Sequence, residues 1–504
     1  MRNLNSGNFW KAAVLASVFL TASAFAAAAK EDRDVVYKPL KFGGVQEFGS
    51  IVEGVVANDA GIVSSANPRL RYEWVDHFGT FLSEEVIVDK RLNLQVGLGG
   101  VFEFPKPEHV IPKYGSSMYK MFFVGPSVAK AVYTFGNLEK PVFTLGGGLF
   151  PYKYNTDAVD LGEYLFRTTP YPATIFTGGL LFVNDNAAYL QGLHARLQLG
   201  DLTVDGLLAT ETSLPPLYDW SLGIVADYQI ANGLMDVGAG VNFKRLIQVK
   251  PSKTQREIQQ NAYFIRNGKN YYGDVGYYKA QKDFYAATGD SVRAASYQSI
   301  VDSVNFWMSS SNPTHIQQSE LNYYTPAGVI LMARASLDLK KIISINLGDA
   351  PFKIFTEAAI LGWKDYPIFY EDKWKRAPVM MGIHLPTFGL LDQLTLQFEY
   401  FNSPWSNNTY NLGAQNVAVP YLPAGAEPLF SKNTYNDVTQ HDNNAWVVLL
   451  RRQLYPHLNL SAQFARDHMR TVGTNWFYGG RLEPSEVLYR NSNWYWMAQL
   501  GWSL

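Results

Sequence analysis

The residues that could support catalysis are the eight histidines and the acidic residues beside them. Asp76-His77 and Asp467-His468 each join a carboxylate to an imidazole, the two groups of a general-base pair. Adjacent side chains on a β-strand point to opposite faces, so neither pair can act together without a bulge. The run from His441 to Asn444 gives no His-x-Ser-Asn arrangement, and the chain has no H-E-x-x-H, no G-x-S-x-G and no phosphate-binding glycine loop. We therefore expect no enzyme, no cofactor and no metal centre.

A second set of ionisable residues occupies alternate positions of strand-like segments, opposite apolar residues. A charge at bilayer depth is unfavourable when it faces lipid, so these side chains should face the interior of a barrel. They are candidates to line a hydrated channel, and their near-even signs predict no strong ion preference. The alternative is an interior salt-bridge network that fills a closed barrel. The channel-lining candidates are Arg71, Glu73, Lys130, His194, Arg196, Asp227, Asp236, Lys244, Arg334, Glu399 and Arg451, and Asp205, Asp338 and Glu357 share their pattern.

The alternation that positions these residues is clearest in the last segment, residues 493–504. One face carries Trp494, Trp496, Leu500, Trp502 and Leu504, as a lipid-facing strand with interfacial aromatic residues would. This ending resembles the C-terminal strand of Gram-negative outer-membrane β-barrels, which the barrel assembly machinery recognises. It departs from that pattern in ending on leucine, where phenylalanine is usual.

Comparable segments recur along the chain, and 18 of them qualify as strands. Downstream of residue 190, short and long connections alternate, as they do between the two ends of a membrane barrel. The sequence therefore predicts an all-β protein, a transmembrane antiparallel β-barrel of about 16–18 strands in one domain, residues 27–504. The predicted strands are 45–57, 70–78, 81–88, 91–104, 128–135, 142–150, 171–183, 190–199, 202–210, 220–228, 234–244, 328–339, 352–363, 378–385, 393–401, 446–453, 457–466 and 493–504.

The first residues and the composition agree with export. Residues 1–26 read as a cleaved signal peptide, with Arg2 and Lys11 before an apolar run and Ala24-Phe25-Ala26 as a cleavage site. The chain has no cysteine, which excludes disulfides and a lipoprotein anchor. Aromatic residues form 14% of the chain, as expected for two interfacial belts, and the net charge of −1 gives no reason to expect nucleic acid as a partner.

The longest interruption of the strand pattern is the insertion 248–327, which contains 13 aromatic residues. It is too long for a passive loop, and Asp290 could cap a helix that carries Tyr297, Val301 and Val304 on one face. Three interpretations stay open. The insertion constricts the pore, binds sugar rings on the cell surface, or forms an external lid that packs its own aromatic residues.

A shorter interruption lies at residues 152–169. Its run from Leu161 to Phe166 is either a short helix that plugs one mouth of the barrel or an ordinary turn. Its carboxylates Asp157, Asp160 and Glu163 could bind calcium, although their spacing matches no known binding loop.

The layout as a whole resembles that of porins, with no motif of one porin family. The resemblance implies an outer membrane location, contact with lipid and lipopolysaccharide, passive diffusion of small hydrophilic solutes, and often a homotrimer. The rival function is a surface-exposed barrel that conducts little and binds an extracellular ligand or polysaccharide through its aromatic-rich loops. A hydrolase is a second rival, for which His194 and His468 are the remaining candidates.

Overall fold

The protein is described by a computed structural model of the 504-residue chain. The structure describes residues 34–38, 41–55, 73–104, 121–166, 188–210, 218–249, 262–273, 275–287, 289–323, 327–343, 348–364, 373–401, 444–466 and 494–503. In this part of the chain, none of the helices is both long and apolar enough to cross a membrane.

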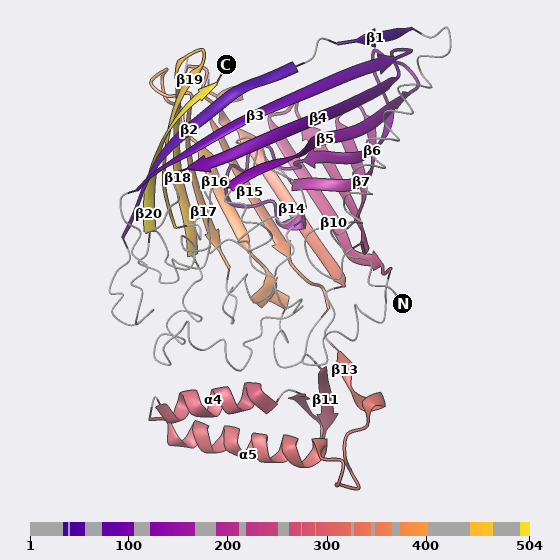
Figure 1. Cartoon of the computed structure of the whole chain (residues 1–504), viewed down its shortest axis with the longest axis vertical. Helices are drawn as coiled ribbons and strands as arrows, with labels where there is room; N and C mark the ends of the chain where they lie inside the picture. Colours follow the sequence, from indigo (N-terminus) through magenta and orange to yellow (C-terminus); the bar gives the residue numbers. More distant parts are fainter. Residues whose placement is uncertain are drawn as a thin grey trace.

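One antiparallel sheet of 17 strands closes on itself to form a barrel (Figure 1). Sixteen strands form the ring, in chain order around it, because β2 pairs with both β3 and β20. Ile51 of β2 lies opposite Trp74 on one side and Ala498 on the other. The ring strands are β2 (Lys41–Val55), β3 (Glu73–Val88), β4 (Leu92–Phe104), β5 (Met121–Phe135), β6 (Phe143–Tyr152), β7 (Ala188–Leu199), β8 (Leu202–Thr210), β9 (Trp220–Ile230), β10 (Met235–Ile247), β14 (Gly328–Asp338), β15 (Lys353–Ile360), β16 (Val379–His384), β17 (Gln393–Tyr400), β18 (Asn444–Tyr455), β19 (Leu458–Arg466) and β20 (Trp494–Ser503).

The seventeenth strand, β1 (Val35–Tyr37), precedes β2 and pairs with the end of β3. The described residues of two predicted strands, 70–78 and 81–88, form one strand in the structure, β3. Gly79 and Thr80 interrupt the sequence pattern there, but β3 pairs with β4 without a break from Asp76 to Val88, so the ladder overrides the local signal. The predicted strand 171–183 lies outside the described residues. The ring of sixteen confirms the predicted fold class.

The short and the long connections lie at opposite ends of the barrel. Turns of a few residues join β3 to β4, β7 to β8, β9 to β10 and β18 to β19. Asp89, Lys90, Ala231 and Asn232 adopt left-handed backbone conformations in these turns, as tight hairpins require. The connections after β2, β4, β6, β8, β10, β15, β17 and β19 leave from the other end. The alternation thus extends upstream of residue 190, where the sequence did not resolve it.

The two faces of the barrel wall differ in chemistry. The outward positions carry exposed apolar residues, such as Leu193, Met381 and Phe398. The inward positions of the barrel strands carry polar residues and, in β6 to β19, buried apolar residues such as Val225 and Val447. Apolar residues are buried on the inner face because a segment of the chain packs against them.

The insertion folds as a small unit of its own, beyond the long-loop ends of the strands (Figure 1). Strands β11 (Ala262–Arg266), β12 (Lys269–Tyr272) and β13 (Asn322–Tyr323) form a three-stranded sheet, and helices α4 (Val275–Ala287) and α5 (Ser291–Met308) pack side by side. The Asp290 carboxylate accepts a hydrogen bond from the Arg293 amide at 3.0 Å and caps α5. Tyr285 and Tyr297 stack between the helices, with ring centroids 5.5 Å apart.

Closure of the ring can be tested by cross-linking its first and last strands. The chain has no cysteine, so Ile51→Cys with Ala498→Cys introduces the only two thiols. Directly opposite residues on antiparallel strands have Cβ atoms about 5 Å apart. We expect a short bifunctional thiol reagent to join them in the folded barrel, which would change the mobility of the denatured chain on gel electrophoresis. The single variant Ile51→Cys is the control, and a folded double variant that never cross-links would contradict the closure.

Candidate functional site: a segment folded into the barrel

Residues 153–166, here called the lumen segment, follow β6 and lie inside the barrel. The segment ends in a single 3-10 turn, η1 (Tyr164–Phe166), which contacts β10, β14 and β15. The wall residues that contact the segment lie at inward positions of their strands. Gln397 and Glu399 are buried beneath it, whereas their neighbours Phe398 and Tyr400 are exposed on the outer surface. Tyr164 and Leu165 are fully buried. The segment therefore occupies part of the barrel interior.

The carboxylate of Glu357, on β15, is the main polar anchor of the lumen segment. It accepts hydrogen bonds from the Tyr154 hydroxyl at 2.6 Å and the Asn155 side-chain amide at 2.7 Å. It also accepts the backbone N–H groups of Glu163 at 3.1 Å and Tyr164 at 2.8 Å. An ionised carboxylate has about four acceptor positions, and neutral donors from the segment use all of them. Burial and the neighbouring Glu357 carboxylate raise the pKa of Tyr154, which keeps its hydroxyl a donor.

Three more inward side chains hold the segment. Glu399 accepts the Tyr164 hydroxyl at 2.6 Å. The Gln397 side-chain oxygen accepts the Asp160 N–H at 2.9 Å and the Leu161 N–H at 3.3 Å. On β10, the Asn242 amide donates to the Leu165 carbonyl at 2.9 Å. These contacts satisfy backbone groups that burial would otherwise leave without partners.

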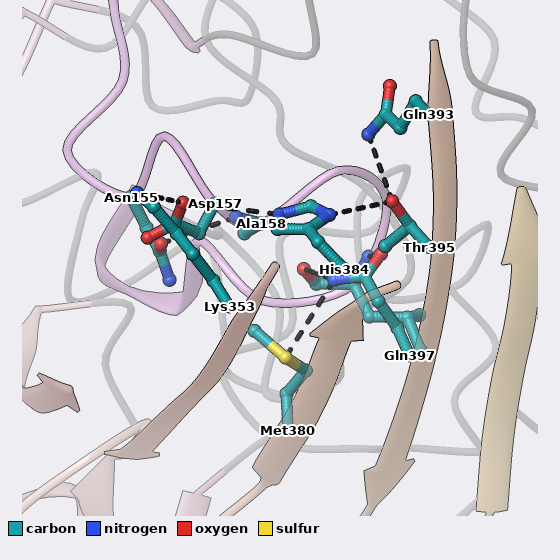
Figure 2. A network of polar contacts seen from close by, with 10 residues as sticks. Asn155, Asp157, Ala158, Lys353, Met380, His384, Gln393, Thr395 and Gln397 are labelled. Atoms are coloured by element: carbon teal, nitrogen blue, oxygen red, sulfur yellow. Dashed lines mark hydrogen bonds and ion pairs between the residues drawn. The ribbon is translucent and has the colours of Figure 1, made fainter. Parts of the chain in front are cut away.

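A further polar network, drawn in Figure 2, joins the segment to β15, β16 and β17. Lys353 Nζ lies 3.0 Å from an oxygen of Asp157, and His384 Nε2 lies 4.0 Å from the same oxygen. The other ring nitrogen of His384 lies 2.8 Å from the Thr395 hydroxyl, and the ring stacks on Phe355 with centroids 4.8 Å apart. His384 is therefore fixed on three sides.

Glycines make room for the segment. A Cβ on Gly240 would lie 2.9 Å from the Leu165 side chain, and one on Gly223 would lie 3.1 Å from the Phe166 ring. Within the segment, Gly162 has φ +97°, which L-residues rarely adopt, and a Cβ there would meet the Met380 methyl at 2.8 Å. The segment thus packs against the glycine-rich inner face of β9 and β10.

A second polar cluster lies on β6 to β8. Arg196 binds both oxygens of Asp205, at 2.7 and 2.9 Å, and His194 Nε2 lies 2.8 Å from one of them. The Tyr152 hydroxyl also donates to Asp205, at 3.1 Å. In the described part of the chain no hydroxyl is hydrogen-bonded to His194, and the cluster is centred on the ion pair of Arg196 and Asp205. The Arg196 side chain is 46% exposed and faces the interior.

The structure brings some of the predicted lining residues together and separates others. His194 and Arg196 meet at Asp205, and Asp227 binds Arg334 at 2.6 Å across Gly238. Glu399 is sealed beneath the lumen segment. Lys130, Asp236, Lys244 and Arg451 lie at inward positions of β5, β10 and β18. Arg71 and the side chain of Glu73 lie outside the described residues, as do those of Asp76-His77 and Asp467-His468.

Asn155, Asn242, Thr395 and Gln397 were not among the predicted site residues. They are neutral amides and hydroxyls that carry no pattern of their own, and only the placement of the segment gives them a role. The signal in the sequence was the break in alternation at 152–169, with the unusual run from Leu161 to Phe166. Among the described residues, no group of three or more His, Asp or Glu is placed to hold a metal ion.

Comparison with known proteins finds no matching family model and no matching curated protein. Three solved structures of engineered variants of the Rhodopseudomonas blastica porin are similar to this chain. Each is covered along its full length and covers 92% of this chain, at 6–7% identity and TM-scores of 0.40, 0.41 and 0.41. The barrel itself is defined by this chain's own strand pairings.

Removing the main anchor should loosen the lumen segment. We expect Glu357→Ala to lower the free energy of unfolding by about 3–5 kcal/mol, because four buried donors lose their acceptor. Denaturant-induced unfolding in lipid vesicles measures the change. The control is Glu139→Ala in an exposed turn, which should shift stability by less than about 0.5 kcal/mol. Equal stabilities for the two variants would contradict the anchor role.

Gly162→Ala tests the turn inside the segment. The left-handed φ and the contact with Met380 should together destabilise the protein by about 1–3 kcal/mol. Gly136 has φ +77° with no atom within 4 Å of a Cβ, so Gly136→Ala carries the backbone strain without the contact. The difference between the two variants in the same unfolding experiment reports the packing, and no difference would mean that the segment is not seated as described.

Proposed function

We propose that the protein is a porin-like channel of the outer membrane, through which small hydrophilic solutes diffuse passively. The observation that carries the proposal is the closed ring of sixteen strands with apolar residues outside and ionisable residues inside. In a bilayer every backbone polar group must find a partner within the protein, and a closed barrel meets that requirement. A ring of this size leaves an aqueous interior in membrane barrels.

Features near the two ends of the chain support the proposed membrane and the direction of insertion. A signal peptide at residues 1–26, cleaved on export, and a C-terminal strand suited to the barrel assembly machinery support an outer membrane location in a Gram-negative cell. The short turns would then face the periplasm and the long loops the outside, where they meet lipopolysaccharide. Barrels of this size often assemble as homotrimers, which we include in the proposal.

The lumen segment would narrow the channel. It packs on the inner faces of strands from β6 to β19, so free passage is left to the remaining part of the interior, beside β2 to β5. Fixed polar groups such as the Arg196–Asp205 pair line the boundary. The narrowing would limit solutes by size, and the anchored segment would keep that limit constant.

The external unit 262–323 supports a second candidate function, capture of an extracellular ligand or polysaccharide with little conductance. It is a folded unit displayed beyond the long-loop end, and Phe306 and Ile265 are exposed on it. Aromatic faces on such a unit suit stacking on sugar rings.

Single-channel conductance of the refolded mature protein in a planar bilayer tests the channel. We expect stable ohmic steps, and larger or noisier steps for Glu357→Ala because the lumen segment is released. A barrel that inserts and resists denaturation but never conducts would overturn the proposal and favour ligand capture.

Deleting the external unit separates the two functions. Its first and last strands are neighbours, with Ala262 opposite Tyr323, so a short Gly/Ser linker can replace residues 262–323 without moving the barrel. The channel proposal expects conductance to persist or increase. The ligand-capture function expects that the intact protein binds polysaccharide on cell surfaces or on glycan arrays and that the deletion variant does not. Under this function neither protein conducts.

A further inference from the structure

Arg451 occupies an inward position of β18, just beyond the lumen segment. Ala445, Val447 and Leu449 share its face of the strand and are buried against the segment's core. Arg451 is the next inward residue toward the short-turn end and is partly exposed. It therefore lies where the packed interior gives way to the part of the barrel that opens to the short-turn end.

The guanidinium of Arg451 differs from those of Arg196 and Arg334 in its contacts. Within the described residues it makes no ion pair and donates no hydrogen bond, whereas Arg196, Arg245 and Arg334 on other strands each bind an aspartate. A partly buried charge without a counter-charge is unfavourable unless water or a solute supplies one. Its five N–H donors thus make no hydrogen bond to any residue that the structure describes.

The described wall positions next to Arg451 are neutral. Gln393 on β17 and Ser461 on β19 are its direct partners in register. The adjacent inward positions hold Thr395 and Gln463. The acids nearest along the chain are engaged elsewhere, since Asp392 binds Arg452 and the Gln453 amide, and Glu399 binds Tyr164. No carboxylate on these strands is free to neutralise Arg451.

We propose that Arg451 binds the carboxylate or phosphate group of anionic solutes and favours their passage. The inference deepens the proposed channel function and names a residue that sets its specificity. The planar guanidinium suits an oxyanion, because it donates two parallel hydrogen bonds to a pair of oxygens. Formal charges on the inner wall nearly balance, but Arg196 and Arg334 are each bound to an aspartate, whereas Arg451 has no ion pair within the described residues.

A single thiol next to Arg451 measures its effect on charged solutes. Ser461→Cys gives the chain its only cysteine, directly opposite Arg451 on the neighbouring strand. The refolded protein in vesicles is treated with thiosulfonate reagents of equal size, one carrying a sulfonate and the other a trimethylammonium group. A unit charge about 6 Å away in water changes each rate about threefold in opposite directions. We expect the anion-to-cation rate ratio to fall about tenfold when Arg451→Gln is added.

Two further variants control for charge and position. Arg451→Lys keeps the charge and should keep most of the ratio. Arg452→Gln removes the same charge one residue away, on the opposite face at the short-turn rim, and should leave the ratio unchanged. Resistance to denaturation on gels verifies that each variant is folded. The reversal potential in a KCl gradient should shift toward cation preference for Arg451→Gln alone.

The rate ratio judges Arg451 independently of conductance. A ratio that is the same with Arg451 and with Gln at this position would overturn the inference, even in a conducting channel. A folded Ser461→Cys protein that reacts with neither reagent would also overturn it, because Arg451 would then not face solutes. A barrel that never conducts but shows the ratio change would remove the channel proposal and leave Arg451 as an anion-binding residue.

Discussion

The pairing of the first and last barrel strands is the constraint on which the rest of this structure depends. An open sheet leaves one edge of unpaired N–H and C=O groups on each side, which neither lipid nor a packed interior can satisfy. Here β2 pairs with β20, and no strand of the described ring has a free edge. The two strands are separated by almost the whole chain, so the barrel is complete only when its C-terminal residues are in place. Every inward and outward position then follows from the pleat.

Closing sixteen strands creates an interior that side chains of the wall cannot fill. The lumen segment fills part of it, and a buried segment brings its own polar backbone with it. The barrel wall provides hydrogen-bond acceptors and donors at inward positions that match the segment, chiefly Glu357 and Gln397. It has glycines where side chains of the segment lie close to the strands. The segment and its seat therefore specify each other. A buried carboxylate with four neutral donors also fixes one arrangement of the segment, because any other would leave several of these groups unsatisfied.

Charge on the inner wall depends on pairing as much as on composition. Asp205 and Asp227 are each bound by an arginine, and the charge of such a pair is felt weakly by a passing solute. Arg451 has the neutral partners Gln393 and Ser461 in register and no ion pair within the described residues. The insertion contributes neither to these ion pairs nor to the surroundings of Arg451. It folds as its own sheet and helix pair beyond the strands, while the shorter segment after β6 enters the barrel (Figure 1). Length alone did not indicate which of the two interruptions goes inside.

The sequence by itself determined the class of fold, the face that each predicted strand turns to the interior and, downstream of residue 190, the alternation of long and short connections. These features follow from a period of two along each strand and from turn residues such as Asn232-Gly233, which are local. Only the tertiary structure decided that residues 73–88 form one strand, which segment enters the barrel and which charges are paired. Glu357 meets Tyr154 across about two hundred residues of chain, and no local pattern records a contact whose two halves are brought together by closure of the ring.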